Sequence, residues 1–194
     1  MNIKIDIYLI LSILILFLFH QASVFLIFYF FVIIHELAHI IMALILKIPV
    51  KEVNFLPFGV NAKFDFKNQR KKEILVAITG PIISLCLAYF IPQYRVQNLF
   101  IAIMNLIPLY PLDGGRILKN LMILKYGLHK TINKYEQILK TLVILLSILN
   151  IWLVIYQKKY QFLFVTIYII QVAGEELKKD KIRKKVKEIL NVEI

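Results

Sequence analysis

The chain has 194 residues, of which 60% are hydrophobic, yet Lys and Arg outnumber Asp and Glu by 24 to 12. This apolar fraction is too large for a soluble domain of this length and excludes a disordered chain. The single cysteine, Cys86, excludes a disulfide scaffold and a cysteine-based metal cluster. A composition that is both very apolar and very basic is typical of a multi-spanning membrane protein whose charges lie in loops.

The apolar segments predict an all-α polytopic membrane protein with six transmembrane helices. Residues 7–34 contain no Asp, Glu, Lys or Arg, and the apolar character continues to residue 46, which is enough for two crossings with a turn near residues 20–23. The predicted spans are residues 5–19, 24–46, 73–91, 98–121, 141–157 and 161–173. They form one membrane domain, residues 1–174, and residues 175–194 follow it as a basic amphipathic tail at the cytoplasmic membrane surface.

The basic residues predict the orientation of these spans. The segments that six spans place on one side carry 21 of the 24 Lys and Arg residues, and the other side has only Arg95, Lys158 and Lys159. By the positive-inside rule both termini are cytoplasmic, which predicts a multi-pass protein of the cell membrane. A nucleic-acid partner is not expected, because acidic residues are mixed through the basic tail.

Charged side chains inside a span are costly and usually mark function, and the second span contains the pattern His35-Glu36-Leu37-Ala38-His39. Two histidines four residues apart lie on one face of a helix, so both can bind the same zinc ion. Glu36, offset around the helix, can accept a proton from the attacking water. Buried polar residues satisfied by neighbouring helices are the alternative, and three such residues within five positions make it less favoured.

A catalytic zinc ion normally has three protein ligands, so a third ligand must reach the depth of the two histidines. Asp113 is the other acidic residue well inside a span. Residues that disrupt helices surround it, namely Pro108, Pro111, Gly114 and Gly115. Irregular backbone at membrane depth is tolerated where it lines a protein-covered site. We therefore expect a broken helix that presents Asp113 to the metal; a merely kinked helix is the alternative.

These motifs resemble the site-2 protease family of intramembrane zinc metalloproteases, and within it the sporulation branch. The similar segments are Ile33–His39, Phe55–Gly59, Ile78–Ile82 and Asn105–Arg116, and the likeness covers about residues 5–190. The resemblance implies one zinc ion per chain on His35, His39 and Asp113, with Glu36 as the catalytic base. It also implies that Asn105 contacts the substrate or an inhibitory membrane protein, whereas the sequence alone equally allows a hydrogen bond between helices.

The resemblance further implies a small membrane-associated β-hairpin between the second and third helices, within residues 50–66, which receives the substrate as an added strand. The alternation of apolar residues on both sides of Pro57-Phe58-Gly59 is compatible with paired strands. The implied substrate is a membrane-tethered protein, in the sporulation branch a pro-sigma factor. Enzymes of that branch carry a nucleotide-binding CBS domain, for which this chain has no room before Ile194, so regulation by ATP through it is not expected.

The residues thus favour an intramembrane zinc metalloendopeptidase that cuts a peptide bond in or near the membrane-tethered segment of its substrate. Two other classes are considered. A membrane metal-ion transporter also places His, Glu and Asp inside spans, although it more often distributes them over several helices. An inactive membrane scaffold has no need for Glu36, so the intact glutamate argues against it.

Overall fold

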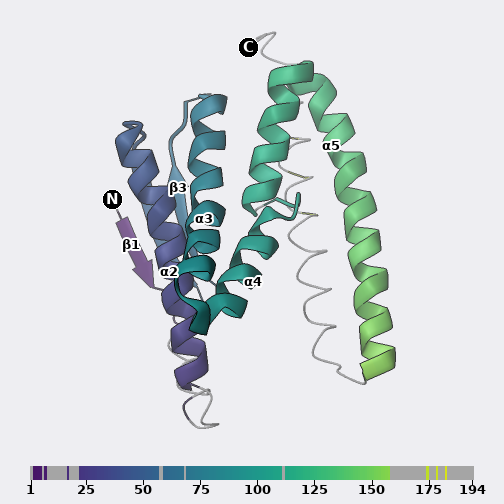
Figure 1. Cartoon of the computed structure of the whole chain (residues 1–194). Helices are drawn as coiled ribbons and strands as arrows, with labels where there is room; N and C mark the ends of the chain where they lie inside the picture. Colours follow the sequence, from purple (N-terminus) through teal and green to yellow (C-terminus); the bar gives the residue numbers. More distant parts are fainter. Residues whose placement is uncertain are drawn as a thin grey trace. The chain divides into compact units, whose positions relative to one another are not determined.

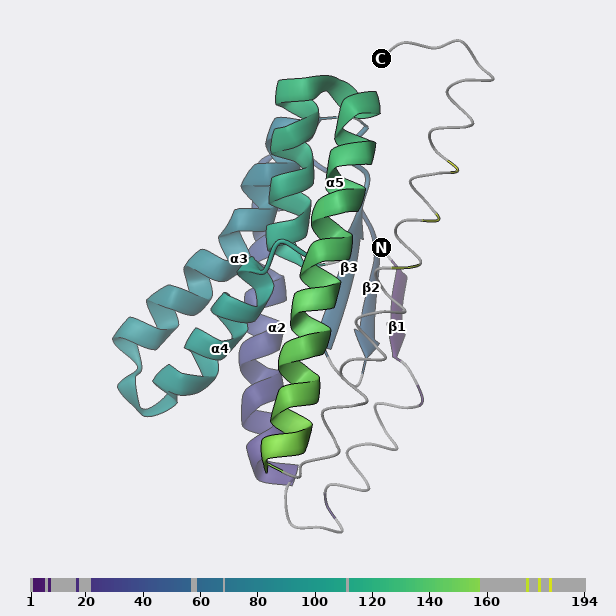
Figure 2. The same ribbon diagram turned by 90° about the vertical axis from the view of Figure 1, so that its right-hand side faces the viewer.

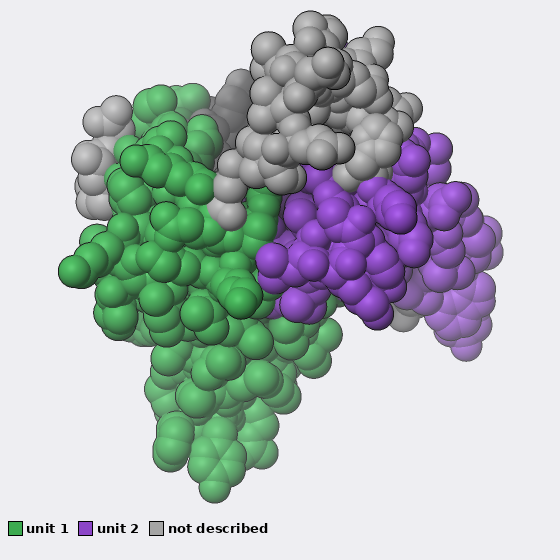
Figure 3. All heavy atoms as spheres, turned by 90° about the horizontal axis from the view of Figure 1, so that it is seen from above, with its two compact units in different colours: residues 1–107 green, residues 108–194 purple. Residues whose placement is uncertain are grey.

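The computed structural model describes residues 2–5, 7, 17, 22–56, 59–67, 69–110, 112–157, 174, 178 and 182. The chain divides into two compact units, Met1–Ile107 and Pro108–Ile194 (Figure 3). Most of the predicted spans 5–19 and 161–173, and most of the predicted tail 175–194, lie outside the described residues.

The described residues are mainly helical, as the sequence predicts, and include one small sheet (Figure 1). In chain order the elements are β1 (Asn2–Ile5), α2 (Ala22–Ile45), β2 (Val50–Leu56), β3 (Gly59–Phe64), α3 (Arg70–Phe90), the 3₁₀ turn η1 (Pro92–Tyr94), α4 (Arg95–Leu106) and α5 (Asp113–Gln157). Within the described part of the chain, two helical segments are long and apolar enough to cross a membrane, Phe25–Ile45 and Arg70–Phe90. They correspond to the predicted second and third spans.

Helices α2 and α3 pack against each other, and the buried residues of α3 at this interface are mostly small or apolar. Ala43 of α2, Val76 of α3 and Ile48 form a buried cluster near the end of α2. The outer face of α2 is apolar and exposed, since Leu37, Ile41 and Leu44 are all at least 45% accessible, as is typical of surfaces that contact lipid or another protein.

Helix α2 ends where Lys47 adopts a φ of 56°, a left-handed conformation that commonly terminates helices. Lys72, in the first turn of α3, donates a hydrogen bond to the carbonyl of Leu46 at 3.1 Å. A cation that satisfies the last carbonyls of a helix also complements its dipole. This contact joins the end of α2 to the beginning of α3 across the hairpin.

The hairpin expected between these helices is confirmed, since β2 and β3 pair antiparallel from Val50↔Phe64 to Leu56↔Gly59, with an irregularity between Val50 and Glu52. The sheet has one more strand than the sequence predicts. β1 pairs parallel with the other side of β2, and the strand order is β1-β2-β3 (Figure 2). Ile5, predicted to begin the first span, pairs with Phe55 in this sheet. The alternation of polar and apolar residues in β1 lies directly before the long apolar run that begins at residue 7. For this reason the sequence pattern predicted that Ile5 belongs to the first span and did not predict the strand.

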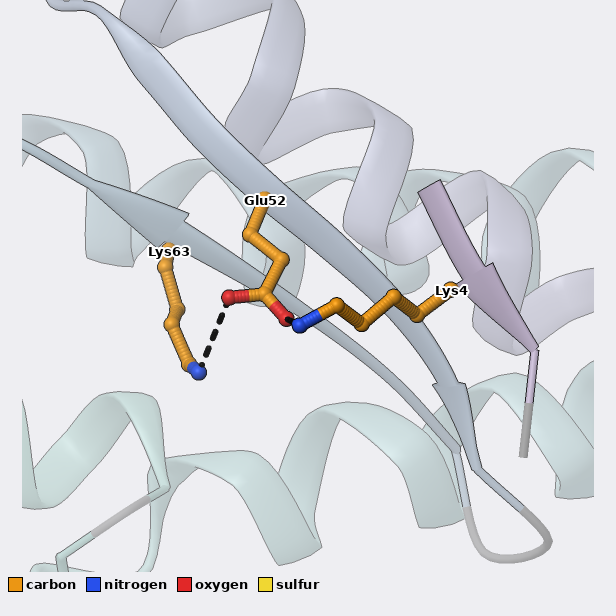
Figure 4. A network of polar contacts seen from close by, with 3 residues as sticks. All are labelled: Lys4, Glu52 and Lys63. Carbon is orange, nitrogen blue, oxygen red and sulfur yellow. Dashed lines mark hydrogen bonds and ion pairs between the residues drawn. The ribbon is translucent and has the colours of Figure 1, made fainter. Parts of the chain in front are cut away.

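An ion triad spans the three strands (Figure 4). Glu52 of β2 pairs with Lys4 of β1 at 2.9 Å and with Lys63 of β3 at 3.1 Å. Its hydrogen bonds to the two ammonium groups lower the pKa of the Glu52 carboxyl to about 2. The triad gives the polar face of the sheet a charge-based link between β1 and the hairpin.

The break expected within the predicted fourth span, residues 98–121, is present, since helix α4 ends at Leu106 and a new helix, α5, begins at Asp113. Pro108 lies between the two helices as expected, but Gly114 and Gly115 belong to the first turn of α5 and do not disrupt it. In Figure 1, α5 consists of two arms joined at a sharp turn, where Gly127 has φ 76° and ψ 165°. The stretch between the fourth and fifth predicted spans is therefore helical and reverses direction at Gly127.

Candidate metal and catalytic site

The two histidines of the HExxH pattern lie on one buried face of α2. His35 is 4% and His39 2% accessible, and their Nε2 atoms are 3.3 Å apart. Two nitrogens about 2.0–2.1 Å from a tetrahedral zinc ion are themselves about 3.3 Å apart. The one-turn spacing of the two residues and their burial thus bring the Nε2 atoms to the separation that a shared metal ion requires.

Helix α3 orients both imidazole rings from the opposite side. His39 Nδ1 lies 2.7 Å from the carbonyl oxygen of Val76, and His35 Nδ1 lies 2.9 Å from Ser84 Oγ. Since a carbonyl can only accept, His39 carries its proton on Nδ1 and presents a lone pair at Nε2. Ser84 supports the same tautomer at His35 when its hydroxyl oxygen accepts. Such outer contacts to metal-binding histidines fix ring orientation and raise ligand basicity.

Gly80 leaves the space in which a metal ion fits. A Cβ atom built on Gly80 is 2.3 Å from His39 Nε2 and 2.6 Å from His35 Nε2. These distances are close to zinc–nitrogen bond lengths, so the volume beside Gly80 where both Nε2 atoms point has the size and donor set of a zinc site. The residues present in the first unit therefore fit a metal ion, and any side chain at position 80 would compete with it.

Glu36 is half-buried and turns from the histidine face toward the sheet. Its Oε1 accepts a hydrogen bond of 2.7 Å from the backbone N–H of Ala62 in β3. A backbone donor on a carboxylate makes a charge-assisted bond. The first unit thus brings together three of the predicted site residues, His35, Glu36 and His39.

Asp113 belongs to the second unit, where it is buried in the first turn of α5. The loop before it returns over that turn, and a Cβ built on Gly115 is 2.3 Å from the nitrogen of Tyr110. Gly115 is therefore required for close approach of the loop backbone, which explains why a helix-disfavouring residue lies inside the helix.

Side chains from both arms of α5 hold this loop. The N–H of Tyr110 donates to Tyr135 Oη at 3.2 Å. Lys119, 6% accessible, has its ammonium 5.3 Å from the ring centre of Tyr110 and 5.5 Å from that of Tyr135. Within the second unit these contacts give the segment before Asp113 a defined conformation.

Asn105 lies at the end of α4, one residue before the break. Its Nδ2 donates to the carbonyl of Ile101 at 3.0 Å, within the same helix. This hydrogen bond stays within α4 and does not join two helices.

Sequence reasoning did not assign roles to Val76, Gly80, Ser84 and Ala62. Val76, Gly80 and Ser84 recur every four residues, so they form one face of α3. A glycine and a serine four residues apart in an otherwise apolar span could have indicated this face from the sequence. The role of the Ala62 N–H has no side-chain signal, because a backbone donor is common to all residues except proline.

Comparison with known proteins identifies the family. The profile of peptidase family M50 matches residues 23–97 and 93–150, which include the motifs of both units. A zinc metalloprotease of Methanocaldococcus jannaschii is 27% identical over 147 residues, covering 67% of this chain and 43% of the relative. Stage IV sporulation protein FB of Bacillus subtilis is 32% identical over 103 residues, covering 45% of this chain and 36% of the relative. The chain therefore spans less than half the length of these relatives.

A solved structure has the same fold. The site-2 protease from Methanocaldococcus jannaschii matches with a TM-score of 0.65 and 24% identity, covering 91% of this chain and 92% of that chain. The resemblance inferred from the HExxH and Leu-Asp-Gly segments is confirmed by the family match, which extends over well over half of the sequence. The chain belongs to peptidase family M50, the family of the site-2 proteases.

Proposed function

We propose that this chain is an intramembrane zinc metalloendopeptidase that cuts a peptide bond in or near the membrane-tethered segment of a protein substrate. The observation that carries the proposal is the buried pair of Nε2 atoms, 3.3 Å apart, with Glu36 adjacent in sequence and Gly80 leaving the space between them. Family membership and the names of the two relatives, both of which the chain covers only in part, support the same activity.

His35, His39 and Asp113 would hold the zinc ion. Two neutral imidazoles and a carboxylate are a usual donor set for catalytic zinc, with a fourth position left open. Asp113 supports this role by its burial in the first turn of α5 and by the close approach of the Tyr110 backbone to the same turn. The chemistry that zinc supplies at such a site is Lewis acidity, which polarises a carbonyl and makes water a better nucleophile.

The residues of this chain supply the proton transfers and the geometry. Glu36 takes a proton from the attacking water and returns it to the nitrogen of the leaving peptide segment. Val76 and Ser84 keep the imidazoles oriented, and the α2–α3 interface excludes bulk water from the buried face. Asn105, at the end of α4, has an amide oxygen with which it can accept a hydrogen bond from an extended substrate backbone.

The proposed setting is the cell membrane, with six spans and both termini in the cytoplasm. The exposed apolar faces of α2 and α3 support membrane insertion. Each unit has exposed aromatic residues at a helix end, namely Tyr89 in the last turn of α3 and the stacked pair Trp152–Tyr156 near the end of α5, as expected at a membrane–water interface.

The substrate class is a membrane-tethered protein, and a pro-sigma factor in spore formation is the specific candidate. Its support is the 32% identity to a sporulation protein and the motif resemblance to that branch. A second function is not proposed, because both histidines and the glutamate lie within residues 35–39 of one helix rather than along a transport path.

The test uses the full chain purified in detergent, with zinc analysis and a tethered pro-sigma reporter. Glu36→Gln should keep about one zinc per chain and reduce cleavage by about 10²–10⁴-fold, the usual contribution of a general base. Glu73→Gln, at the edge of α3, is the matched control and should remain active. Asp113→Ala should lose zinc if it is the third ligand. Cleavage by Glu36→Gln at the wild-type rate would contradict the mechanism, and a zinc-free wild type would contradict the metal site.

A further inference from the structure

Strand β3 runs along the helix that carries the proposed catalytic residues. Two hydrogen bonds join them, from Tyr29 Oη to the carbonyl of Gly59 at 3.3 Å and from the N–H of Ala62 to Glu36 Oε1 at 2.7 Å. Between these two bonds, a Cβ built on Gly59 is 3.7 Å from Val32 Cγ1. Positions 29, 32 and 36 form one stripe of α2, so the edge of β3 is docked along that stripe.

The Ala62 N–H points away from β2, toward the outer edge of the sheet. It donates to Glu36, on the side away from β2, although Ala62 pairs with Val53 in the β2–β3 ladder. Outward-facing backbone groups recur every two residues in an edge strand, so the N–H of Val60 faces the same edge. In the strand order β1-β2-β3 of the described sheet, β3 is an outer strand. Its outer edge is the edge of the sheet that lies next to Glu36.

One N–H group donates a well-aligned hydrogen bond to only one acceptor at a time. A substrate that joins the sheet at β3 offers its own carbonyls to the outward N–H groups, and the one nearest the catalytic side chain is that of Ala62. Glu36 and the substrate backbone therefore compete for the same donor.

From this competition we propose that β3 is a latch on Glu36. Without substrate, the Ala62 N–H holds the Glu36 carboxylate against the strand. A substrate segment that pairs with the β3 edge takes over this N–H and releases Glu36 to accept the proton of the attacking water. The inference rests on the proposed protease function and adds a selection rule: chains that can form a strand are cut, and peptides too short to do so are cut slowly.

The contact itself can be tested without activity. Hydrogen–deuterium exchange of the full chain in detergent is followed in fragments that cover residues 59–64. Glu36→Ala should accelerate exchange at Ala62, because the acceptor is removed, whereas Glu36→Gln should retain the protection, because its amide oxygen also accepts. Equal protection at Ala62 in wild type and in Glu36→Ala would overturn the latch.

The catalytic consequence is tested with Ala62→Pro, which deletes the N–H. The position is on a strand edge and the lost donor is not part of the β2–β3 ladder, so proline is tolerable there. Val60→Pro deletes the neighbouring outward N–H, which does not face Glu36, and is the matched control. The probes are a quenched tetrapeptide, too short to pair as a strand, and fluorescein-labelled casein as a long unfolded chain.

Ala62→Pro should cut the tetrapeptide about tenfold faster than wild type, the lower end of what a hydrogen bond to a charged group contributes. Val60→Pro should change the tetrapeptide rate less than Ala62→Pro does, and both variants should cut casein more slowly. Tyr29→Phe, which removes the second bond to β3, should raise the tetrapeptide rate by a smaller factor and keeps the test available if Ala62→Pro does not fold.

A tetrapeptide rate in Ala62→Pro at or below that of Val60→Pro would overturn the proposal, since the N–H would then position Glu36 rather than restrain it. Unchanged casein rates in both variants would mean that substrate joins the sheet elsewhere, which also overturns it. If the zinc-loaded wild type cut neither probe nor the tethered reporter, the protease function would fail. The exchange measurement would then still decide whether Glu36 holds the strand.

Discussion

The two halves of the candidate site are built in different ways. His35 and His39 come from consecutive turns of one continuous helix, and a neighbouring helix orients both rings through Val76 and Ser84. Asp113 follows a break between two helices and depends on a loop that returns over its own helix. Each half contains one glycine at a close approach, but Gly80 faces the ligand atoms whereas Gly115 faces the loop backbone. The spacing of the two histidines in the first half therefore follows from helix periodicity, whereas the position of Asp113 depends on a loop that folds back on α5.

Gly80→Ala should have the largest effect on metal binding. Its methyl group would lie 2.3 Å from His39 Nε2 and occupy the space of the metal ion. We expect loss of stoichiometric zinc with the helices retained, measured by elemental analysis and circular dichroism. Cys86→Ala, on the exposed face of the same helix, should bind zinc normally. Full zinc occupancy in Gly80→Ala would show that the metal does not lie beside this residue.

Gly115→Ala tests the loop-dependent half. Its methyl group would lie 2.3 Å from the Tyr110 nitrogen, so backbone must move, at a cost of about 1–3 kcal/mol for overpacking. Thermal unfolding should report this loss, and zinc affinity should fall without disappearing. Gly174→Ala, which meets nothing within 4 Å, is the control. If Gly115→Ala abolished zinc as completely as Gly80→Ala, the contrast between the two glycines would be wrong.

Ser84→Ala removes an orienting contact but no ligand. The effect of such second-layer changes on metal affinity is usually about 10–100-fold, and we expect a loss in this range in competition with a zinc chelator. Cys86→Ala again serves as control. An unchanged affinity would indicate that the α2 helix alone orients His35.

Tyr135→Phe removes the acceptor of the Tyr110 N–H and should cost about 0.5–1.5 kcal/mol of unfolding free energy. Zinc affinity should change less than in Gly115→Ala, because the loop backbone keeps its packing. Tyr126→Phe, at an exposed ring, should be neutral to unfolding. A larger effect of Tyr135→Phe than of Gly115→Ala would reverse the order of importance within this half.

The smallest expected effect concerns the sheet next to the first half. The folded pKa of Glu52 is about 2, below its ordinary value of 4.5, so its stabilising contribution is present above pH 4.5 and is lost as the pH falls toward 2. The protection of residues 2–5 against hydrogen exchange, relative to the intrinsic exchange rate at each pH, should therefore fall over this window, and Glu52→Gln should remove this change in protection. A wild-type profile that is flat in this range would show that the triad does not hold β1.

Sequence alone predicted those features that follow from local periodicity. The apolar lengths predicted α2 and α3, and the four-residue spacing predicted a shared histidine face. The hairpin was implied by the family resemblance, and the alternation around residues 57–59 was compatible with it. Each of these depends on neighbours within a few residues, where backbone geometry relates sequence position directly to spatial position.

Which residues pack against each of these elements was decided by the tertiary structure alone. The parallel addition of β1, the reversal of α5 at Gly127 and the helical conformation of Gly115 all depend on packing that a propensity does not encode. The contacts that complete the site join residues 26 to 49 positions apart, from Ala62 to Glu36 and from Ser84 to His35. Such pairs are set by how helices and strands pack, so the sequence could identify the chemistry of the site but not the groups that hold it in place.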